Sequence, residues 1–223
     1  MTDRLTNKIL LDKESLIRAA GTFATVESKH QEPLLFGITD GKAVGTYLEQ
    51  KFRTYLQERY QFIPGNSASG IDIPELLVDI KTTSVRQPQS SCPFKSARQK
   101  VYGLGYSLLV FVYDKKDDSV LSTANLLIQH VVFVEHERTG DYQTTTGLLK
   151  IIENHGNEDD VLAFLQERML PMDDIQAIAL AAEILNTPPE IGFLTISNAL
   201  QWRLQYGRVI VNAGNVNGIR KVL

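Results

Sequence analysis

The sequence predicts an α/β (α+β) fold, in which helices flank a mixed β-sheet and a mainly helical region follows. Three observations lead to this expectation. Residues 41–60 repeat an apolar side chain every four positions, as one face of a helix requires. Residues 76–82 and 108–113 have the composition of β-strands. After residue 157 the sequence changes to helix-forming segments.

Two helices are expected before the first strand. A short one lies around Lys13 to Ala20, and a longer one spans Gly41 to Tyr60. Its apolar stripe consists of Val44, Leu48, Phe52 and Leu56. Glu49 lies immediately beside this stripe, so its carboxylate is expected at the border of the buried helix face.

The strand expected at Leu76 to Thr82 carries an acid and a base on one face. Asp79 and Lys81 point the same way because side chains alternate along a strand. Asp72 ends a short apolar strand just upstream, and Pro74 then lets the chain turn. The sequence therefore predicts that two acids and a lysine come close together.

The following elements alternate between helix and strand. Ser96 to Gly105 is expected to be helical. Leu108 to Tyr113 is a continuous β-prone run, typical of a buried central strand, and Leu126 to Glu135 is a further strand candidate.

The C-terminal region is expected to contain three helices. They span Glu158 to Met169, Asp173 to Asn186 with a capping aspartate, and Ser197 to Tyr206. A short strand at Arg208 to Val211 and a hairpin tip at residues 214–218 follow. The last two helices and this hairpin could form a helix-turn-helix with a β wing, and plain helical packing is the alternative.

The composition excludes several classes of protein. The single cysteine, Cys92, expected as a free thiol near a loop, excludes an internal disulfide and a multi-cysteine zinc site. The four histidines lack metal-ligand spacing, and no Gly-x-x-x-x-Gly-Lys phosphate loop occurs. Because no stretch approaches roughly 18 apolar residues and the start does not resemble a signal peptide, we expect a cytoplasmic protein without a membrane span.

The net charge of −3 does not indicate a nucleic-acid binder, but the charges are unevenly distributed. Residues 81–113 contain five basic side chains and residues 191–223 contain four, and neither stretch contains an acid. Residues 153–190 contain nine acids and one arginine. Such polarity suits a protein that presents selected faces to a polyanion. Chance clustering on solvated faces is the alternative.

Asp72, Asp79 and Lys81 together suit the cleavage of a phosphodiester. Magnesium prefers oxygen ligands, stabilises charge on the phosphoryl group and activates water. The two acids are seven positions apart, which allows both carboxylates to reach one ion. The lysine can orient or deprotonate the attacking water. A structural ion pair between Asp79 and Lys81 is the main alternative, because buried charges need a partner.

Two blocks of this sequence resemble the PD-(D/E)XK nuclease superfamily, and within it the nicking enzyme MutH and its restriction-enzyme relatives. The blocks are Gly41-Lys-Ala-Val-Gly-Thr-Tyr-Leu-Glu49 and Asp72-Ile-Pro-Glu-Leu-Leu-Val-Asp79-Ile-Lys81-Thr. The resemblance implies a restriction-endonuclease-like fold. It also implies that Glu49, Asp72 and Asp79 are catalytic residues and metal ligands, and that Lys81 is the catalytic lysine.

The sequence departs from the MutH pattern in three respects, the first of which is a longer gap between Glu49 and the strand. Asp79 replaces the usual glutamate. The further downstream lysine of MutH has two candidates here, Lys95 and Lys100. Glu58 competes with Glu49 as the acid of the helix, and we prefer Glu49 because the Gly-Lys-x-Val-Gly-x-x-Leu-Glu pattern surrounds it.

The resemblance implies a sequence-specific type II restriction endonuclease that cuts double-stranded DNA with Mg²⁺. A homodimer and a cognate DNA methyltransferase in the same system are the expected partners. Residues 1–150 would then be the endonuclease core domain. Residues 151–223 would be a mainly helical C-terminal region, with a winged-helix-like DNA-contacting subdomain as one interpretation.

Two other functions stay open, a MutH-like mismatch-repair nicking endonuclease and a non-catalytic DNA-binding regulator. Several polar residues could approach DNA, and they serve equally well as ordinary solvated side chains. They are Gln87, Gln89, Ser90, Arg98, Gln201, Arg203 and Arg208.

Overall fold

A computed structural model describes residues 8–65, 70–91, 96–197 and 203–223. The chain forms two compact units, each assembled from separate stretches of sequence. Unit 1 comprises residues 1–87, 109–133 and 221–223, and unit 2 comprises residues 88–108 and 134–220. The expected mixed sheet flanked by helices is confirmed.

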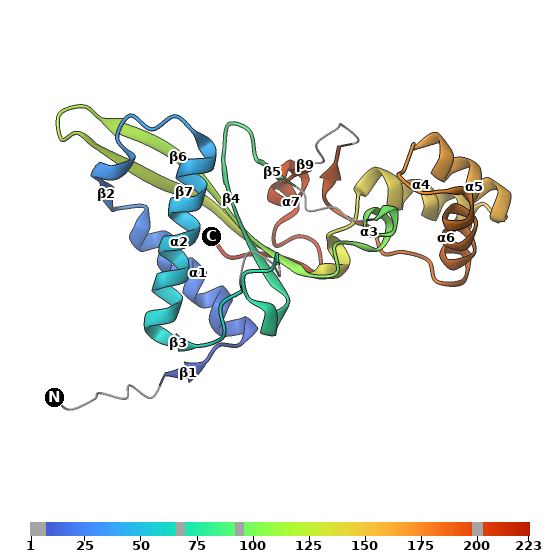
Figure 1. Ribbon diagram of the computed structural model, residues 1–223, viewed down its shortest axis with the longest axis horizontal. Helices are drawn as coiled ribbons and strands as arrows, with labels where there is room; N and C mark the ends of the chain where they lie inside the picture. Colours follow the sequence, from blue (N-terminus) through green and yellow to red (C-terminus); the bar gives the residue numbers. More distant parts are fainter. Residues whose placement is uncertain (1–7, 66–69, 92–95, 198–202) are drawn as a thin grey trace. The chain divides into compact units, whose positions relative to one another are not determined.

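The largest sheet has the strand order β10-β7-β6-β4, and β2 also pairs with β7 (Figure 1). The long strands are β6 (Ser107–Asp118) and β7 (Thr123–Val134), which contain the two strand segments expected from the sequence. The remaining strands are β4 (Val78–Ser84), β10 (Ile219–Lys221) and β2 (Gln31–Glu32). A separate parallel pair joins β1 (Ile9–Leu10) to β3 (Tyr60–Gln61).

Two helices, α1 (Lys13–Glu27) and α2 (Gly41–Arg59), pack beside each other against the sheet of unit 1 (Figure 1). Their apolar faces meet strand residues in one core that contains the whole predicted stripe of α2. The fully buried ring of Phe52 lies at its centre, 5.0 Å from the ring of Phe23 and 4.9 Å from that of Phe111. This core fixes α2 above β4.

Unit 2 contains five helices among its described residues, with α4, α5 and α6 grouped together (Figure 1). They are α3 (Ala97–Tyr102), α4 (Tyr142–Glu153), α5 (Glu158–Glu167), α6 (Asp174–Asn186) and α7 (Gly207–Asn212). The expected cap of α6 is confirmed, because the side chain of Asp173 accepts a hydrogen bond from Gln176 N at 2.8 Å. Helix α4 was not expected.

A small sheet in unit 2 has the order β5-β9-β8, with bounds Gln89–Ser91, Arg203–Gln205 and Thr195–Ile196. The prediction of a helix from Ser197 to Tyr206 is wrong, because Arg203–Gln205 is a strand paired on both sides. The predicted strand at Arg208 to Val211 is also wrong, since these residues belong to α7. The described residues therefore do not form the helix-turn-helix with a β wing that the sequence suggested.

Single turns of 3-10 helix complete the described elements: η1 (Pro33–Leu35), η2 (Pro74–Leu76) and η3 (His136–Arg138). Three residues discussed above, Cys92, Lys95 and Gln201, lie outside the described residues. Within the described part of the chain, no helix combines the length and the apolar character needed to cross a membrane.

The aromatic core of unit 1 gives a stability prediction. Phe52→Ala would leave a cavity under α2, so we expect the free energy of unfolding of unit 1 to fall by about 3–5 kcal/mol. Urea denaturation followed by circular dichroism measures this change. Val120→Ala, at a side chain that is 92% exposed, is the control and should shift stability by less than about 0.5 kcal/mol. Equal stability of the two variants would contradict this description of the core.

Candidate active site

Strand β4 places an acid and a lysine together on one face, as its alternation predicted. Asp79 is buried, and its Oδ2 atom lies 2.6 Å from Nζ of the partly buried Lys81. The carboxyl groups of Asp79 and Asp72 are also within hydrogen-bonding distance of each other. The structure therefore brings all three predicted residues to one place in unit 1.

Asp72 reaches this position by a turn rather than at the end of a strand. The turn η2 begins at Pro74, and Leu77 adopts a left-handed conformation with φ of 51° that sends the chain back into β4. A backbone hydrogen bond from Ile73 N to Val78 O, 2.9 Å long, closes the reversal. The expectation of a short strand at Asp72 is wrong, but the expected meeting of the two carboxyls is found.

Two groups fix the carboxylate of Asp72. Its Oδ2 atom accepts a hydrogen bond of 2.8 Å from Ile80 N, and its Oδ1 atom accepts one from the guanidinium of Arg53. Arg53 was not among the predicted site residues. Its spacing of four residues from Glu49, which places both on the same side of α2, was the one signal that could have identified it.

Helix α2 approaches β4 closely at Gly45, where a β-carbon would lie only 2.8 Å from Oγ1 of Thr82. One turn further on, Glu49 Oε1 accepts a hydrogen bond of 3.1 Å from the same Thr82 hydroxyl. Glu58, the competing acid, pairs with Arg59 at 3.0 Å and its side chain is 64% exposed. The structure thus brings Glu49, and not Glu58, into contact with β4.

Burial disfavours the charged forms of two acids at this site, Asp79 and Glu49. Burial raises the pKa of Asp79 to about 7, with Lys81 opposing this change and Asp72 adding to it. Burial also raises the pKa of the Glu49 carboxyl, and the charge of Lys81 and the Thr82 hydroxyl oppose that shift. Extra positive charge at this place would therefore stabilise the ionised acids.

The donor set suits a hard divalent cation. Asp72 and Asp79 contribute adjacent carboxylate oxygens, which are the ligands that Mg²⁺ prefers, and a cation would relieve the repulsion between them. Glu49, expected as a third ligand, accepts the Thr82 hydrogen bond through one of its two carboxylate oxygens. Among the described residues, no three acidic, histidine or cysteine side chains gather closely enough to form a complete metal-binding group. The geometry of the described residues therefore supports Asp72 and Asp79 as cation ligands more directly than a set of three.

Of the two downstream lysine candidates, Lys100 lies within the described residues. Lys100 lies on α3 in unit 2, where it is only 3% exposed, and burial lowers the pKa of its amine while the charge of Asp141 opposes this. Its amine is thus turned away from solvent. Lys95, the other candidate, lies outside the described residues.

Comparison with known proteins covers nearly the whole chain. Residues 10–221, which include every residue of this cluster, match the family described as type II restriction enzyme NspV. The chain is also 63% identical to the type II restriction enzyme NspV of Nostoc sp. over 213 residues, or 96% of this chain and 97% of the relative. No solved structure matches it. The predicted resemblance to restriction enzymes is confirmed, and the chain belongs to the NspV family of type II restriction enzymes.

Proposed function

We propose that this protein is a sequence-specific type II restriction endonuclease that hydrolyses double-stranded DNA with Mg²⁺. The observation that carries the proposal is the pairing of the buried Asp79 with the partly buried Asp72, with Lys81 beside them, in a chain of the NspV family. We assign Asp72, Asp79, Lys81 and Glu49 as the catalytic residues. The pattern of these residues fits the PD-(D/E)XK superfamily.

Asp72 and Asp79 would hold the cation between their carboxylates. When bound, the ion supplies charge stabilisation for the phosphoryl group and lowers the pKa of a bound water. Arg53 and the Ile80 N–H each bind one oxygen of Asp72, which keeps the Asp72 carboxylate oriented toward Asp79. The orientation of this ligand is thus set before DNA binds.

Lys81 is placed to act on the reacting groups. Its ammonium nitrogen lies 2.6 Å from Oδ2 of Asp79. This ion pair fixes the position of the ammonium group at the end of a flexible side chain. From there it would donate a hydrogen bond to the attacking water or to a phosphate oxygen, and it would stabilise the negative charge that develops on the phosphoryl oxygens. Glu49 accepts a hydrogen bond from Thr82 of the same strand, and we assign it the role of accepting hydrogen bonds from water near this point.

The proposed activity implies particular partners. Duplex DNA is the substrate, and cutting both strands of a palindromic site suits a homodimer with twofold symmetry. A cognate methyltransferase acting in the same cytoplasm would protect the cell's own copies of the site.

Substitutions in the cluster test the assignment of the site. We expect Asp72→Asn, Asp79→Asn and Lys81→Ala to lower the cleavage rate by about 10²–10⁴-fold, because each removes a group that acts on the reacting phosphate or holds the cation. Glu49→Gln should also lose activity. The cleavage rate is measured on a plasmid that the wild-type protein cuts.

The matched control is Glu58→Gln, an exposed acid on the same helix, which should cleave at the wild-type rate. If Asp79→Asn or Lys81→Ala also cleaved at that rate, the pair would be an ordinary structural ion pair. A non-catalytic regulator would give no cleavage by the wild-type protein with any metal.

The form of the product tests the type of cleavage. Incubation of supercoiled plasmid with Mg²⁺ should yield linear DNA, and EDTA should abolish the reaction until excess Mg²⁺ restores it. Agarose gel electrophoresis separates linear DNA from open circles. Open circles as the final product would instead support a MutH-like nicking enzyme, and cleavage that persists in EDTA would contradict the proposed metal.

A further inference from the structure

The small sheet of unit 2 has two faces of different chemistry. Strand β9 runs antiparallel to both neighbours, and its central Leu204 lies opposite Ser90 of β5 and Ile196 of β8. Leu204 and Ile196 are buried. Because side chains alternate along each strand, the residues on either side of Leu204 point to the other face.

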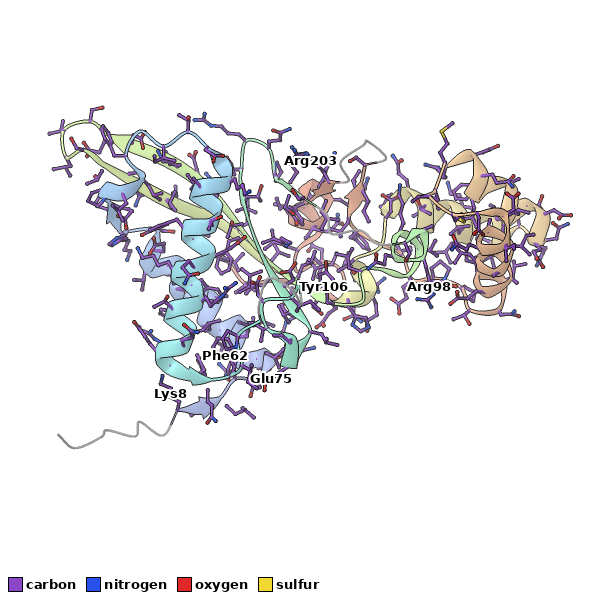
Figure 2. The ribbon with its side chains drawn as sticks, in the orientation of Figure 1. Lys8, Phe62, Glu75, Arg98, Tyr106 and Arg203 are labelled. Atoms are coloured by element: carbon purple, nitrogen blue, oxygen red, sulfur yellow. The ribbon has the colours of Figure 1, made fainter. Side chains whose placement is uncertain are left out.

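That other face is wholly polar. Gln205 is opposite Gln89 on one side and Thr195 on the other, which makes a row across all three strands. Arg203 and Ser91, two positions along, form a second row. Gln205 and Ser91 are exposed, and the others are partly exposed. We call these five residues the polar sheet face (Figure 2 labels Arg203).

The buried side of the sheet is held rigidly in unit 2. The carboxylate of Asp141, itself buried, accepts a hydrogen bond of 2.8 Å from Ile196 N and two more from Thr144. The hydroxyls of Ser90 and Tyr206 are 2.5 Å apart, and Tyr206 N donates to Pro88 O at 2.8 Å. The polar sheet face therefore rests on a fixed support, as a recognition surface requires.

The polar sheet face has the side chains that read DNA bases. Arginine binds the O6 and N7 atoms of guanine in a bidentate manner, glutamine binds the N6 and N7 atoms of adenine likewise, and serine or threonine contacts either base. β-Sheets present such side chains to a DNA groove in several known DNA-binding proteins. None of these five residues is acidic, and residues 191–223 contain no acid at all, so phosphates would not be repelled.

Two arginines that the sequence also offered for DNA contact, Arg98 and Arg208, are engaged elsewhere. The guanidinium of Arg98 pairs with Glu183 at 2.6 Å, and that of Arg208 lies 3.6 Å from the centre of the Tyr142 ring. Arg203 is instead placed opposite Ser91 and beside the row of glutamines. Arg203 is therefore a better candidate for contact with DNA than Arg98 or Arg208.

The chain itself limits how far the polar sheet face lies from the site of cleavage. Gln89 follows Lys81 by eight residues. Eight residues of fully extended chain span at most about 29 Å. With about 3.4 Å of rise for each base pair, this corresponds to at most about eight base pairs of DNA.

We propose that the polar sheet face determines the recognition sequence, with Arg203 selecting a G·C pair and Gln205 and Gln89 selecting A·T pairs in the major groove. This inference rests on the proposed function, since it names the part of the protein that chooses where the proposed nuclease cuts.

The test compares discrimination between sites, and not activity alone. Wild type, Arg203→Lys and Gln205→Ala are assayed on a cognate duplex and on every duplex that differs from it by one base pair. Lysine keeps the charge of Arg203 but not its bidentate geometry. We expect each variant to lose about 5–150-fold in preference for the cognate at one base pair only, as the loss of one bidentate contact implies. Gln166→Ala, at an exposed glutamine of α5, is the control and should keep full discrimination.

Binding of the same duplexes in EDTA, followed by fluorescence anisotropy, gives a second readout that needs no cleavage. If the variants lose discrimination in binding, the inference is supported, even when none of the proteins cleaves DNA. The absence of cleavage by the wild-type protein would refute only the proposed nuclease activity. Variants that weaken binding equally for all duplexes, or that discriminate like wild type at every position, would overturn the inference. Circular dichroism and thermal unfolding identify a variant that fails to fold, and Gln89→Ala then replaces it.

Discussion

Two carboxylates in contact, those of Asp72 and Asp79, are the constraint on which the rest of the proposed site depends. Like charges at this distance repel each other, and burial makes the repulsion stronger because little water screens it. Arg53, the Ile80 N–H and Lys81 surround the pair with positive charge and hydrogen-bond donors. Even with these groups present, burial and the nearby Asp72 raise the pKa of Asp79 to about 7, so a bound cation would further favour the ionised pair.

The architecture of unit 1 can be understood as the means of holding this pair. The aromatic core around Phe52 fixes α2 on the sheet, and the absence of a side chain at Gly45 lets the helix approach Thr82. That approach places Glu49 and Arg53 beside β4. The turn through Leu77 returns Asp72 to Asp79, so one helix, one turn and one strand supply every group of the site.

Much of this site could be predicted because it follows from local rules. Strand alternation alone places Asp79 and Lys81 on one face, and the helix stripe places Glu49 at its border. The contact of Arg53 with Asp72 could not be predicted in this way, since it depends on where helix and turn meet in space. The burial of Lys100 is likewise a tertiary property that its sequence neighbours do not reveal.

Local rules were least successful in the C-terminal region. Arg203 to Gln205 form a strand because β5, more than 110 positions earlier in the chain, pairs with them. The β-prone residues Arg208 to Val211 instead adopt the helix α7, where Val209 is the buried member. In both places tertiary contacts override the preference of a short segment. The polar sheet face became recognisable only once strands from distant parts of the sequence had been placed side by side.

The most direct test of the central claim is to locate the cation itself. A crystal of the protein with duplex DNA and Mn²⁺, which replaces Mg²⁺ and scatters X-rays anomalously, shows the position of the ion. The account predicts an anomalous peak bound by one oxygen from each of Asp72 and Asp79, with Lys81 within hydrogen-bonding distance of the scissile phosphate or its water. A peak elsewhere, or no peak while the Asp79 to Lys81 ion pair persists in the DNA complex, would contradict it.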